Sequence, residues 1–358
     1  PYTAEQGWVS ADQDYTASPP GQRPTTGFAS WRQVLSNVLT LFSGAALARV
    51  LAALILVIIA RQIGPQAYGQ YSASLALVGL TSVLFSLGLD AWLLYQGGRD
   101  LEQLDIWFTS ALFLKASLGA LWLLGVWALT PYLNQESFPW SLVFLASLAL
   151  WLEEMAKIVW SAFKVRLRND LTLILMILVQ IIFLGATLLL ASQQIQEPEP
   201  YLGGRLLAAC IGAMASGLLI VRRLGLQLRM EAVWTTLRTA LPFAVSLGLA
   251  LVYGQAALAI VAGELGGAAA GIYAPAINVT NALFLIPIAI FEVMVPILSR
   301  GHARSQAWVR RVSLRLLPIM MVVGVALGIA LVLASRPLVL LLYGPAYSAS
   351  VEVLATLG

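Results

Sequence analysis

Nine long apolar segments dominate the sequence and decide the kind of environment in which it can fold. Each is long enough to cross a membrane as a helix, because the hydrocarbon layer is about 30 Å thick and a helix rises about 1.5 Å per residue. We therefore predict an all-α fold, a polytopic membrane helix bundle. The segments run at about residues 35–60, 71–95, 107–129, 140–161, 171–191, 202–221, 240–262, 273–298 and 313–335, and the start of a further helix follows at Tyr347.

The composition excludes the main alternatives to a membrane protein. The chain of 358 residues is 59% hydrophobic and 11% charged, whereas a soluble domain carries about 25% charged residues. A disordered chain needs the opposite balance, with low hydrophobicity and high net charge. One cysteine, Cys210, and one histidine, His302, provide neither a disulfide nor a cluster of metal ligands. The sequence contains no Walker A loop. We therefore predict no metal, no cofactor and no nucleic-acid partner.

Basic residues predict how the chain is oriented. The loops that follow even-numbered segments hold thirteen of them, whereas the loops after odd-numbered segments hold three: Arg61, Arg205 and Arg336. Cytoplasmic loops carry the excess of Lys and Arg, so the N-terminus is expected in the cytoplasm. Residues 1–30 contain Pro19, Pro20 and Pro24 and no apolar run, which is typical of a disordered cytoplasmic tail. The outer loops are too short for a catalytic domain, so the sequence favours a transporter over an enzyme.

An internal repeat divides the chain. After a shift of 202 positions, Ile63–Tyr71 aligns with Leu265–Tyr273, and both stretches read apolar-Gly-x4-Gly-x-Tyr. The shift spans six segments, so the two halves are predicted to be parallel repeats. We predict a first six-helix lobe over residues 31–225. The second lobe, residues 226–358, is expected to be incomplete. It contains the seventh to ninth helices of the chain and the start of the tenth.

Several motifs resemble one family. The stretches Ala60–Tyr71 and Ser86–Asp90, then Gly271–Ala276, Val295–Ser299 and Leu342–Tyr347, resemble the polysaccharide (O-antigen type) flippases. These belong to the multidrug/oligosaccharidyl-lipid/polysaccharide exporter superfamily. The resemblance implies two lobes around a central cavity in the bacterial inner membrane. The implied cargo is a polyprenyl-pyrophosphate-linked oligosaccharide, used for surface polysaccharide or lipopolysaccharide. Further implied partners are membrane lipids, a coupling proton or sodium ion, and other membrane proteins of polysaccharide assembly.

Two other functions remain open from the sequence. One is a multidrug or small-cation exporter of the same superfamily, driven by an ion gradient. The other is an integral-membrane polysaccharide polymerase or ligase.

Two cations lie inside the predicted spans. Charged groups in hydrocarbon cost about 2.5–3.5 kcal/mol on insertion scales, so each should face a cavity or a partner. Arg49 lies near the middle of the first span, and its guanidinium suits a substrate pyrophosphate; the alternative is a structural ion pair. Lys115 in the third span either contacts the substrate or extends to the cytoplasmic interface.

Five further residues are candidates for ion coupling or for a gate. Glu153 and Glu154 both lie within helical reach of Lys157, which predicts either a neutralised helix end or a proton site. Asp90 and Glu292 differ by the repeat offset of 202 and are expected at equivalent positions in the two lobes. They either close a gate or simply balance the basic loops.

Overall fold

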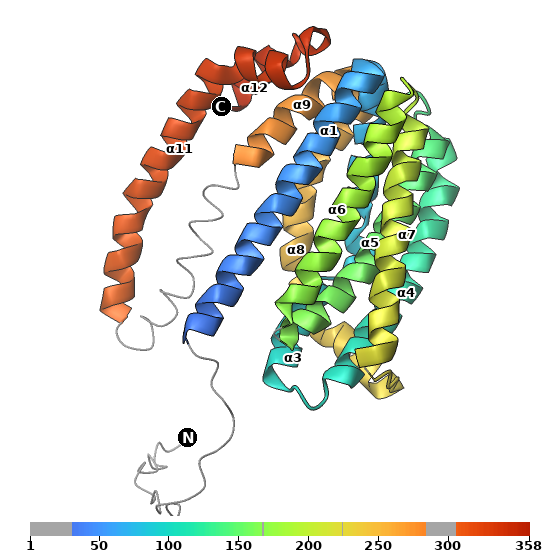
Figure 1. Cartoon of the computed structure of the whole chain (residues 1–358), viewed down its shortest axis with the longest axis vertical. Helices are drawn as coiled ribbons and strands as arrows, with labels where there is room; N and C mark the ends of the chain where they lie inside the picture. Colours follow the sequence, from blue (N-terminus) through green and yellow to red (C-terminus); the bar gives the residue numbers. More distant parts are fainter. Residues whose placement is uncertain (1–30, 167, 224, 284–305) are drawn as a thin grey trace, which may run out of the picture. The chain divides into compact units, whose positions relative to one another are not determined.

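Every regular element in the described part of the chain is a helix. The structure is a computed structural model and describes residues 31–166, 168–223, 225–283 and 306–358 (Figure 1). The helices are α1 (Trp31–Thr81), α2 (Val83–Ser86), α3 (Leu89–Arg99), α4 (Leu104–Leu129), η1 (Thr130–Tyr132), α5 (Trp140–Val165), α6 (Asn169–Ser192), α7 (Pro198–Arg223), α8 (Met230–Leu265), α9 (Gly267–Leu283), α11 (Gln306–Leu342), η2 (Pro345–Tyr347) and α12 (Ser350–Leu357).

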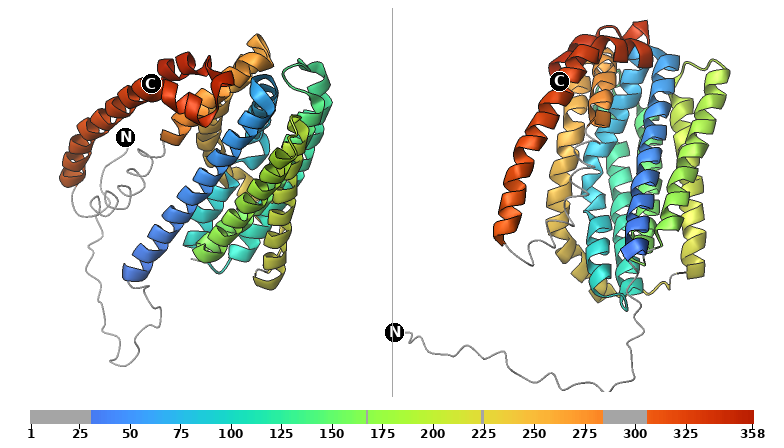
Figure 2. Two further views of the ribbon diagram at one scale, coloured as in Figure 1. Left: turned by 45° about the horizontal axis from the view of Figure 1, so that its top comes forward. Right: turned by 60° about the vertical axis from the view of Figure 1, so that its left-hand side comes forward.

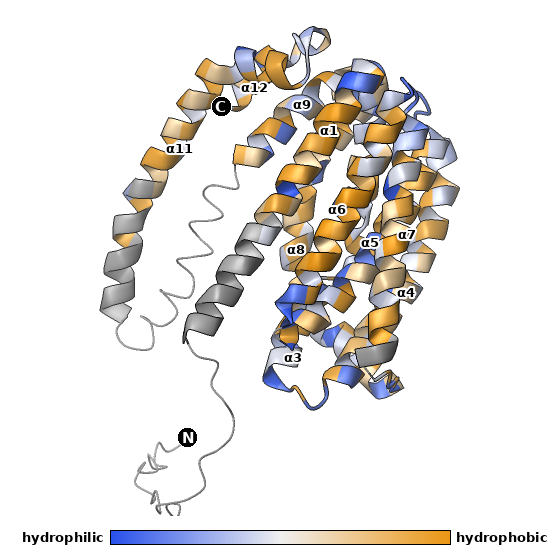
Figure 3. Ribbon diagram, in the orientation of Figure 1, coloured by the Kyte–Doolittle hydropathy of each residue, from blue (hydrophilic) through white to orange (hydrophobic). Residues whose placement is uncertain are grey.

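The predicted spans are found as helices. The first two meet at Gly64 within α1, and the second continues through α2 and α3. The third to seventh correspond to α4, α5, α6, α7 and α8, the eighth begins in α9, and the ninth lies in α11. Six helical segments of the described residues are long and apolar enough to cross a membrane, and apolar residues extend along most of their lengths (Figure 3). The prediction of an all-α membrane bundle is therefore confirmed.

Residues 41–358 form one compact unit, which contains parts of both predicted lobes. Within it α5 packs against α3, α4 and α7, while α8 packs along α2, α3 and α4 (Figure 2). The indole of Trp92 in α3 donates a hydrogen bond of 2.9 Å to Thr239 of α8. The boundary near residue 225 and the extent of the tail stay predictions, and residues 1–30 lie outside the described part.

The second span is interrupted just before one of the candidate residues. Leu87 and Gly88 both adopt positive φ angles, 43° and 63°, which end α2 and begin α3. Gly88 also lies against the backbone of Phe243 in α8, where a Cβ would collide. Only glycine combines this conformation with so close an approach. The break places Asp90 in the first turn of α3, where the helix dipole favours a negative charge.

The two repeat motifs cross each other at one end of the bundle. Gly64 (φ 76°, ψ 172°) and Gly266 (φ 90°, ψ 170°) share one backbone conformation. A Cβ at Gly69 would overlap the carbonyl oxygen of Gly267, and a Cβ at Gly271 would overlap that of Pro65. The 202-residue shift maps each of these contacts onto the other. Such reciprocity is the mark of a two-fold relation, while the complete six-helix repeat remains a prediction.

We expect alanine to disrupt this crossing. Gly69→Ala or Gly271→Ala should lower the free energy of unfolding by about 1–3 kcal/mol, because the added methyl group forces the two backbones apart. Thermal unfolding in detergent measures the loss. Gly125→Ala is the matched control, since a Cβ there meets no atom within 4 Å. Equal melting temperatures for the Gly69 and Gly125 variants would contradict the close crossing.

Candidate functional site

Four charged side chains from α3, α4 and α5 form a continuous chain inside the bundle. The Lys115 ammonium in α4 lies 2.7 Å from Asp90 Oδ2 of α3 and 2.7 Å from Glu154 Oε2 of α5. Glu154 Oε1 also lies 2.6 Å from Lys157 Nζ, one turn further along α5. The side chain of Lys115 is fully buried, whereas that of Lys157 is 45% exposed. Three helices are thus tied together around one buried lysine.

The sequence suggested that Lys115 contacts the substrate or extends to the cytoplasmic interface. In the structure Lys115 instead forms buried ion pairs with two acids. Its side chain has no exposed surface and does not line the cavity described below. Of the two acids within reach of Lys157, Glu154 makes the contact. The second oxygen of Asp90 is buried and accepts no hydrogen bond from any described residue. Hence the pair formed by Lys115 and Asp90 holds a carboxylate that is only partly satisfied.

The other acid of α5 binds an arginine of α7. Arg205 donates two hydrogen bonds to Glu153, from Nε to Oε1 at 2.8 Å and from Nη2 to Oε2 at 3.0 Å. This fork geometry is the strongest form of an Arg–carboxylate pair. The sequence analysis grouped Arg205 with the loops because it lies close to the start of the sixth apolar segment. In the structure it lies seven residues into α7, about 10 Å from the start of the helix.

Arg205 forms part of the wall of a cavity of about 220 Å³ between helices of both predicted lobes. Its polar lining consists of Arg205 with Tyr68, Ser72, Gln255 and Asn278, and no acidic residue of the described chain lines it. The amide of Asn278 in α9 donates a 2.9 Å hydrogen bond to the Tyr68 hydroxyl. The wall therefore combines one cation with neutral hydrogen-bonding groups, which suits an anionic oxygen group.

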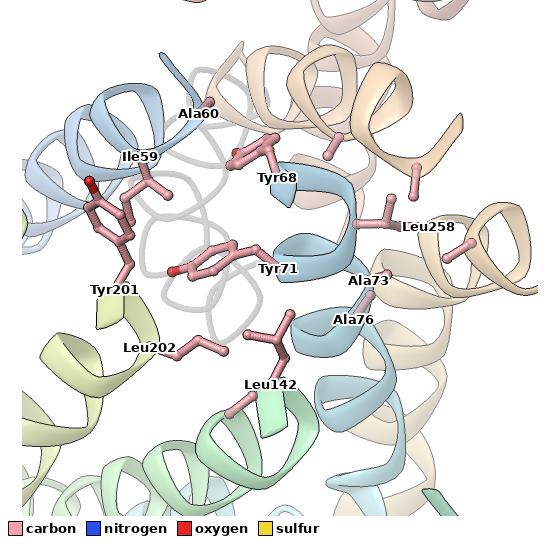
Figure 4. Close-up of a cluster of buried hydrophobic side chains, with 14 of the residues drawn as sticks. Ile59, Ala60, Tyr68, Tyr71, Ala73, Ala76, Leu142, Tyr201, Leu202 and Leu258 are labelled. Carbon is pink, nitrogen blue, oxygen red and sulfur yellow. The ribbon is translucent and has the colours of Figure 1, made fainter. Parts of the chain in front are cut away.

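Tyrosines cluster near this cavity. Figure 4 shows Tyr68 and Tyr71 projecting from the second half of α1, with Tyr201 of α7 on the other side of the cluster. The rings of Tyr68 and Tyr71 are stacked, with centroids 6.1 Å apart. The hydroxyl of Tyr71 is buried and interacts with the guanidinium of Arg205. These rings carry polar groups into a largely apolar core.

The end of the bundle that carries Gly64 is held by hydrogen bonds to helix ends. Arg61 donates from Nε to the Leu342 carbonyl at 2.6 Å and from Nη2 to the Leu341 carbonyl, which satisfies acceptors at the C-terminus of α11. The Tyr347 hydroxyl donates to the Ala60 carbonyl at 2.6 Å. Gly344 repeats the conformation of Gly64 (φ 91°, ψ 177°). α1 is thereby joined to the α11–η2 junction.

The structure separates the remaining candidates. Arg49 is exposed, does not line the cavity, and forms no ion pair with a described residue. Glu292 lies outside the described residues, so its equivalence to Asp90 stays a prediction. No group of three or more metal-ligating side chains is present in the part of the chain that the structure describes.

Comparison with solved structures identifies the fold. A structure described as the inward-facing conformation of a multidrug resistance MATE family transporter of the MOP superfamily matches with a TM-score of 0.58. The match covers 86% of this chain and 75% of that one at 17% identity. A MOP superfamily transporter from Pyrococcus furiosus, described by the reverse polarity of its binding pocket, matches with a TM-score of 0.62. It covers 89% of this chain and 76% of that one at 14% identity.

The chain therefore has the fold of these MATE-like transporters of the MOP superfamily. Residues 58–352 match the model of a protein family described as polysaccharide biosynthesis protein. The chain belongs to that family. A search of curated proteins gave no match.

We expect the buried lysine to be needed for stability. Lys115→Met should lower the free energy of unfolding by about 3 kcal/mol, because it leaves Asp90 uncompensated in the bundle. Adding Asp90→Asn should restore part of the loss. Arg168→Met is the control: its 3.4 Å pair with Asp170 is exposed and should contribute less than about 1 kcal/mol. Chemical unfolding in detergent compares the variants, and similar losses for both lysine and arginine would contradict this account.

Proposed function

We propose that the protein is a flippase that moves a polyprenyl-pyrophosphate-linked oligosaccharide across the bacterial inner membrane by alternating access. The observation that supports this proposal is Arg205, a guanidinium on the wall of a membrane cavity whose described lining contains no acid. Guanidinium forks match the geometry of phosphate oxygens. Membership of a polysaccharide biosynthesis family agrees with such a cargo.

The chemistry of the cavity suits the head of such a lipid. Two of the five N–H donors of Arg205 bind Glu153, and the Tyr71 hydroxyl also interacts with this guanidinium. The remaining donors can bind another acceptor. Ser72, Gln255 and Asn278 offer neutral donors and acceptors to sugar hydroxyls. Pockets for drug-sized ligands measure about 300–1,000 Å³, so a cavity of about 220 Å³ accepts the charged head group and no long sugar chain. The saccharide then requires a wider state of the cavity.

The other candidate residues fit this proposal in two roles. Arg49 is exposed and lacks an acidic partner among the described residues, so we assign it a second contact to the anionic cargo in the wider state. The chain from Asp90 through Lys115 and Glu154 to Lys157 is the candidate site for a coupling proton or sodium ion. We assign the N-terminus to the cytoplasm, because alternate loops carry an excess of basic residues.

Export of organic cations is the second candidate, because the structural neighbours include a multidrug resistance transporter. A carrier of cations needs an acid that the cargo can reach. Glu153, the acid that contacts the arginine of the cavity wall, is occupied by Arg205 on both oxygens. A polymerase or ligase is disfavoured, because Thr130–Pro139 and Gln193–Glu197, the described segments between α4 and α5 and between α6 and α7, are short.

Flipping in proteoliposomes tests the cargo. A fluorescent polyprenyl-pyrophosphate oligosaccharide should cross the bilayer with the wild type, and Arg205→Ala should slow the transfer by about tenfold or more through loss of charge-assisted hydrogen bonds. Arg205→Lys should recover only part, because lysine lacks the fork. Arg49→Ala should produce a smaller loss. Arg168→Ala, which removes an exposed arginine, is the control for a lost positive charge.

Two results would contradict the proposal. If the wild type ignores the lipid-linked sugar and exchanges small organic cations, the protein is a cation exporter. If the sugar crosses equally well with wild type and a folded Arg205→Ala variant, the anionic cargo is recognised elsewhere.

A further inference from the structure

The cation of the cavity is already neutralised by an acid of the protein. Glu153 receives both of its hydrogen bonds from Arg205, and the two side chains are 19% and 24% exposed. An incoming phosphate group that approaches through the cavity therefore meets an arginine whose fork is occupied. Because phosphate and carboxylate both accept the same bidentate hydrogen bonds, the two compete for one guanidinium.

A displaced Glu153 would need a new partner nearby. An unpaired carboxylate inside a membrane protein is costly, and removing one member of a buried pair is strongly destabilising. Lys157 lies four residues further along α5, the spacing at which acidic and basic side chains meet on one helix face. It already lies within electrostatic reach of Glu153. The position of Lys157 therefore provides the partner that the exchange requires.

Lys157 is also free to accept a second acid. Its ammonium has three donors, and Glu154 receives one of them. Its side chain is 45% exposed, in contrast to the fully buried Lys115. Glu154 in turn keeps Lys115 as a second partner at 2.7 Å. A shift of Glu153 to Lys157 thus leaves each of the three side chains Glu153, Glu154 and Lys157 with a counter-charge.

We propose that the Arg205–Glu153 pair is a latch that the cargo itself opens: the phosphate group takes Arg205, and Glu153 transfers to Lys157. This inference rests on the proposed function, because it assumes that the cargo brings an anionic oxygen group into the cavity. The exchange replaces one ion pair by two and requires no proton from outside. It connects an event in the cavity to the charge chain of Asp90, Lys115, Glu154 and Lys157.

The latch has a structural consequence. The Arg205–Glu153 pair joins α5 to α7, two helices that are in extensive contact. Opening it removes a bidentate tie between them and adds a contact within α5 alone. Cargo binding therefore loosens α7 relative to α5, and this change provides the cavity with a means to widen after the head group has entered.

Binding to variants in nanodiscs tests the latch. The probes are geranylgeranyl pyrophosphate, which carries the lipid-linked head group, and inorganic pyrophosphate, which carries the same group without lipid. Glu153→Gln should bind the lipid probe about tenfold more tightly than wild type, because the competing charge is gone. Glu153→Asp, which keeps the charge but shortens the reach, should give a smaller gain. Glu199→Gln is the control: it removes one acid from α7 that hydrogen-bonds Ser141 instead, and its affinity should equal that of wild type.

A double-mutant cycle tests the second step. Lys157→Gln should weaken probe binding about threefold to tenfold in the wild-type background, since a displaced Glu153 then lacks its acceptor. The same substitution should have no effect in the Glu153→Gln background. A role for Lys157 in stability alone would lower the melting temperature but leave probe affinity unchanged in both backgrounds, which would overturn the transfer to Lys157.

The remaining outcomes separate the latch from the function. If Arg205→Ala abolishes binding while Glu153→Gln leaves it unchanged or weaker, the latch is wrong and the anionic cargo stands. If inorganic pyrophosphate binds as tightly as the lipid probe and Glu153→Gln tightens both, the latch stands and the lipid-linked cargo is wrong. If wild type and Glu153→Gln bind neither probe, both proposals fail.

Discussion

The cost of charge in hydrocarbon is the constraint on which the first lobe depends. Lys115 is fully buried, and its position is tolerable only because Asp90 and Glu154 both lie 2.7 Å from it. These acids come from α3 and α5, so the pairing fixes how both helices are rotated against α4. The break at Gly88 serves the same requirement, because it begins α3 just before Asp90. Electrostatics thus specifies packing that apolar side chains alone would leave loosely determined in lipid.

The end of the bundle that carries Gly64 is held in a different way, by backbone contacts. Where Pro65–Gly69 crosses Gly267–Gly271, the glycines Gly69 and Gly271 let the two backbones touch directly, as small residues do in membrane proteins. Arg61 and Tyr347 add hydrogen bonds to backbone carbonyls of α11 and α1. None of these contacts depends on cargo charge. The contacts at this end accordingly do not involve the ion pairs of Lys115 and Arg205.

Span positions and the glycine repeat were predictable, because both depend on local properties of the sequence. A run of about 20 apolar residues is a sufficient signal for a spanning helix, and the conformations of Gly64 and Gly266 follow from one shared motif. The choice between Glu153 and Glu154 as partner of Lys157 was not predictable, since both lie within one turn of it. That choice depends on α4 and α7, which present Lys115 to one acid and Arg205 to the other. Arg205 itself was detectable by the rule for charged residues inside spans, but its closeness to a segment end concealed it.

Charge balance among these residues bears directly on selectivity. In the described spans around α5, the acids Asp90, Glu153 and Glu154 are matched by Lys115, Lys157 and Arg205. A charged cargo that binds one of these six side chains must therefore displace an internal partner. The preference for an anion or a cation then depends on which member of a pair the cargo reaches first. In the cavity that member is Arg205, while Glu153 is not among the lining residues. An anion in the cavity can bind Arg205 directly, whereas a cation would first have to separate Glu153 from the guanidinium of Arg205. Under the proposed function, the same internal neutrality that stabilises this part of the bundle in lipid also biases the cavity toward anions.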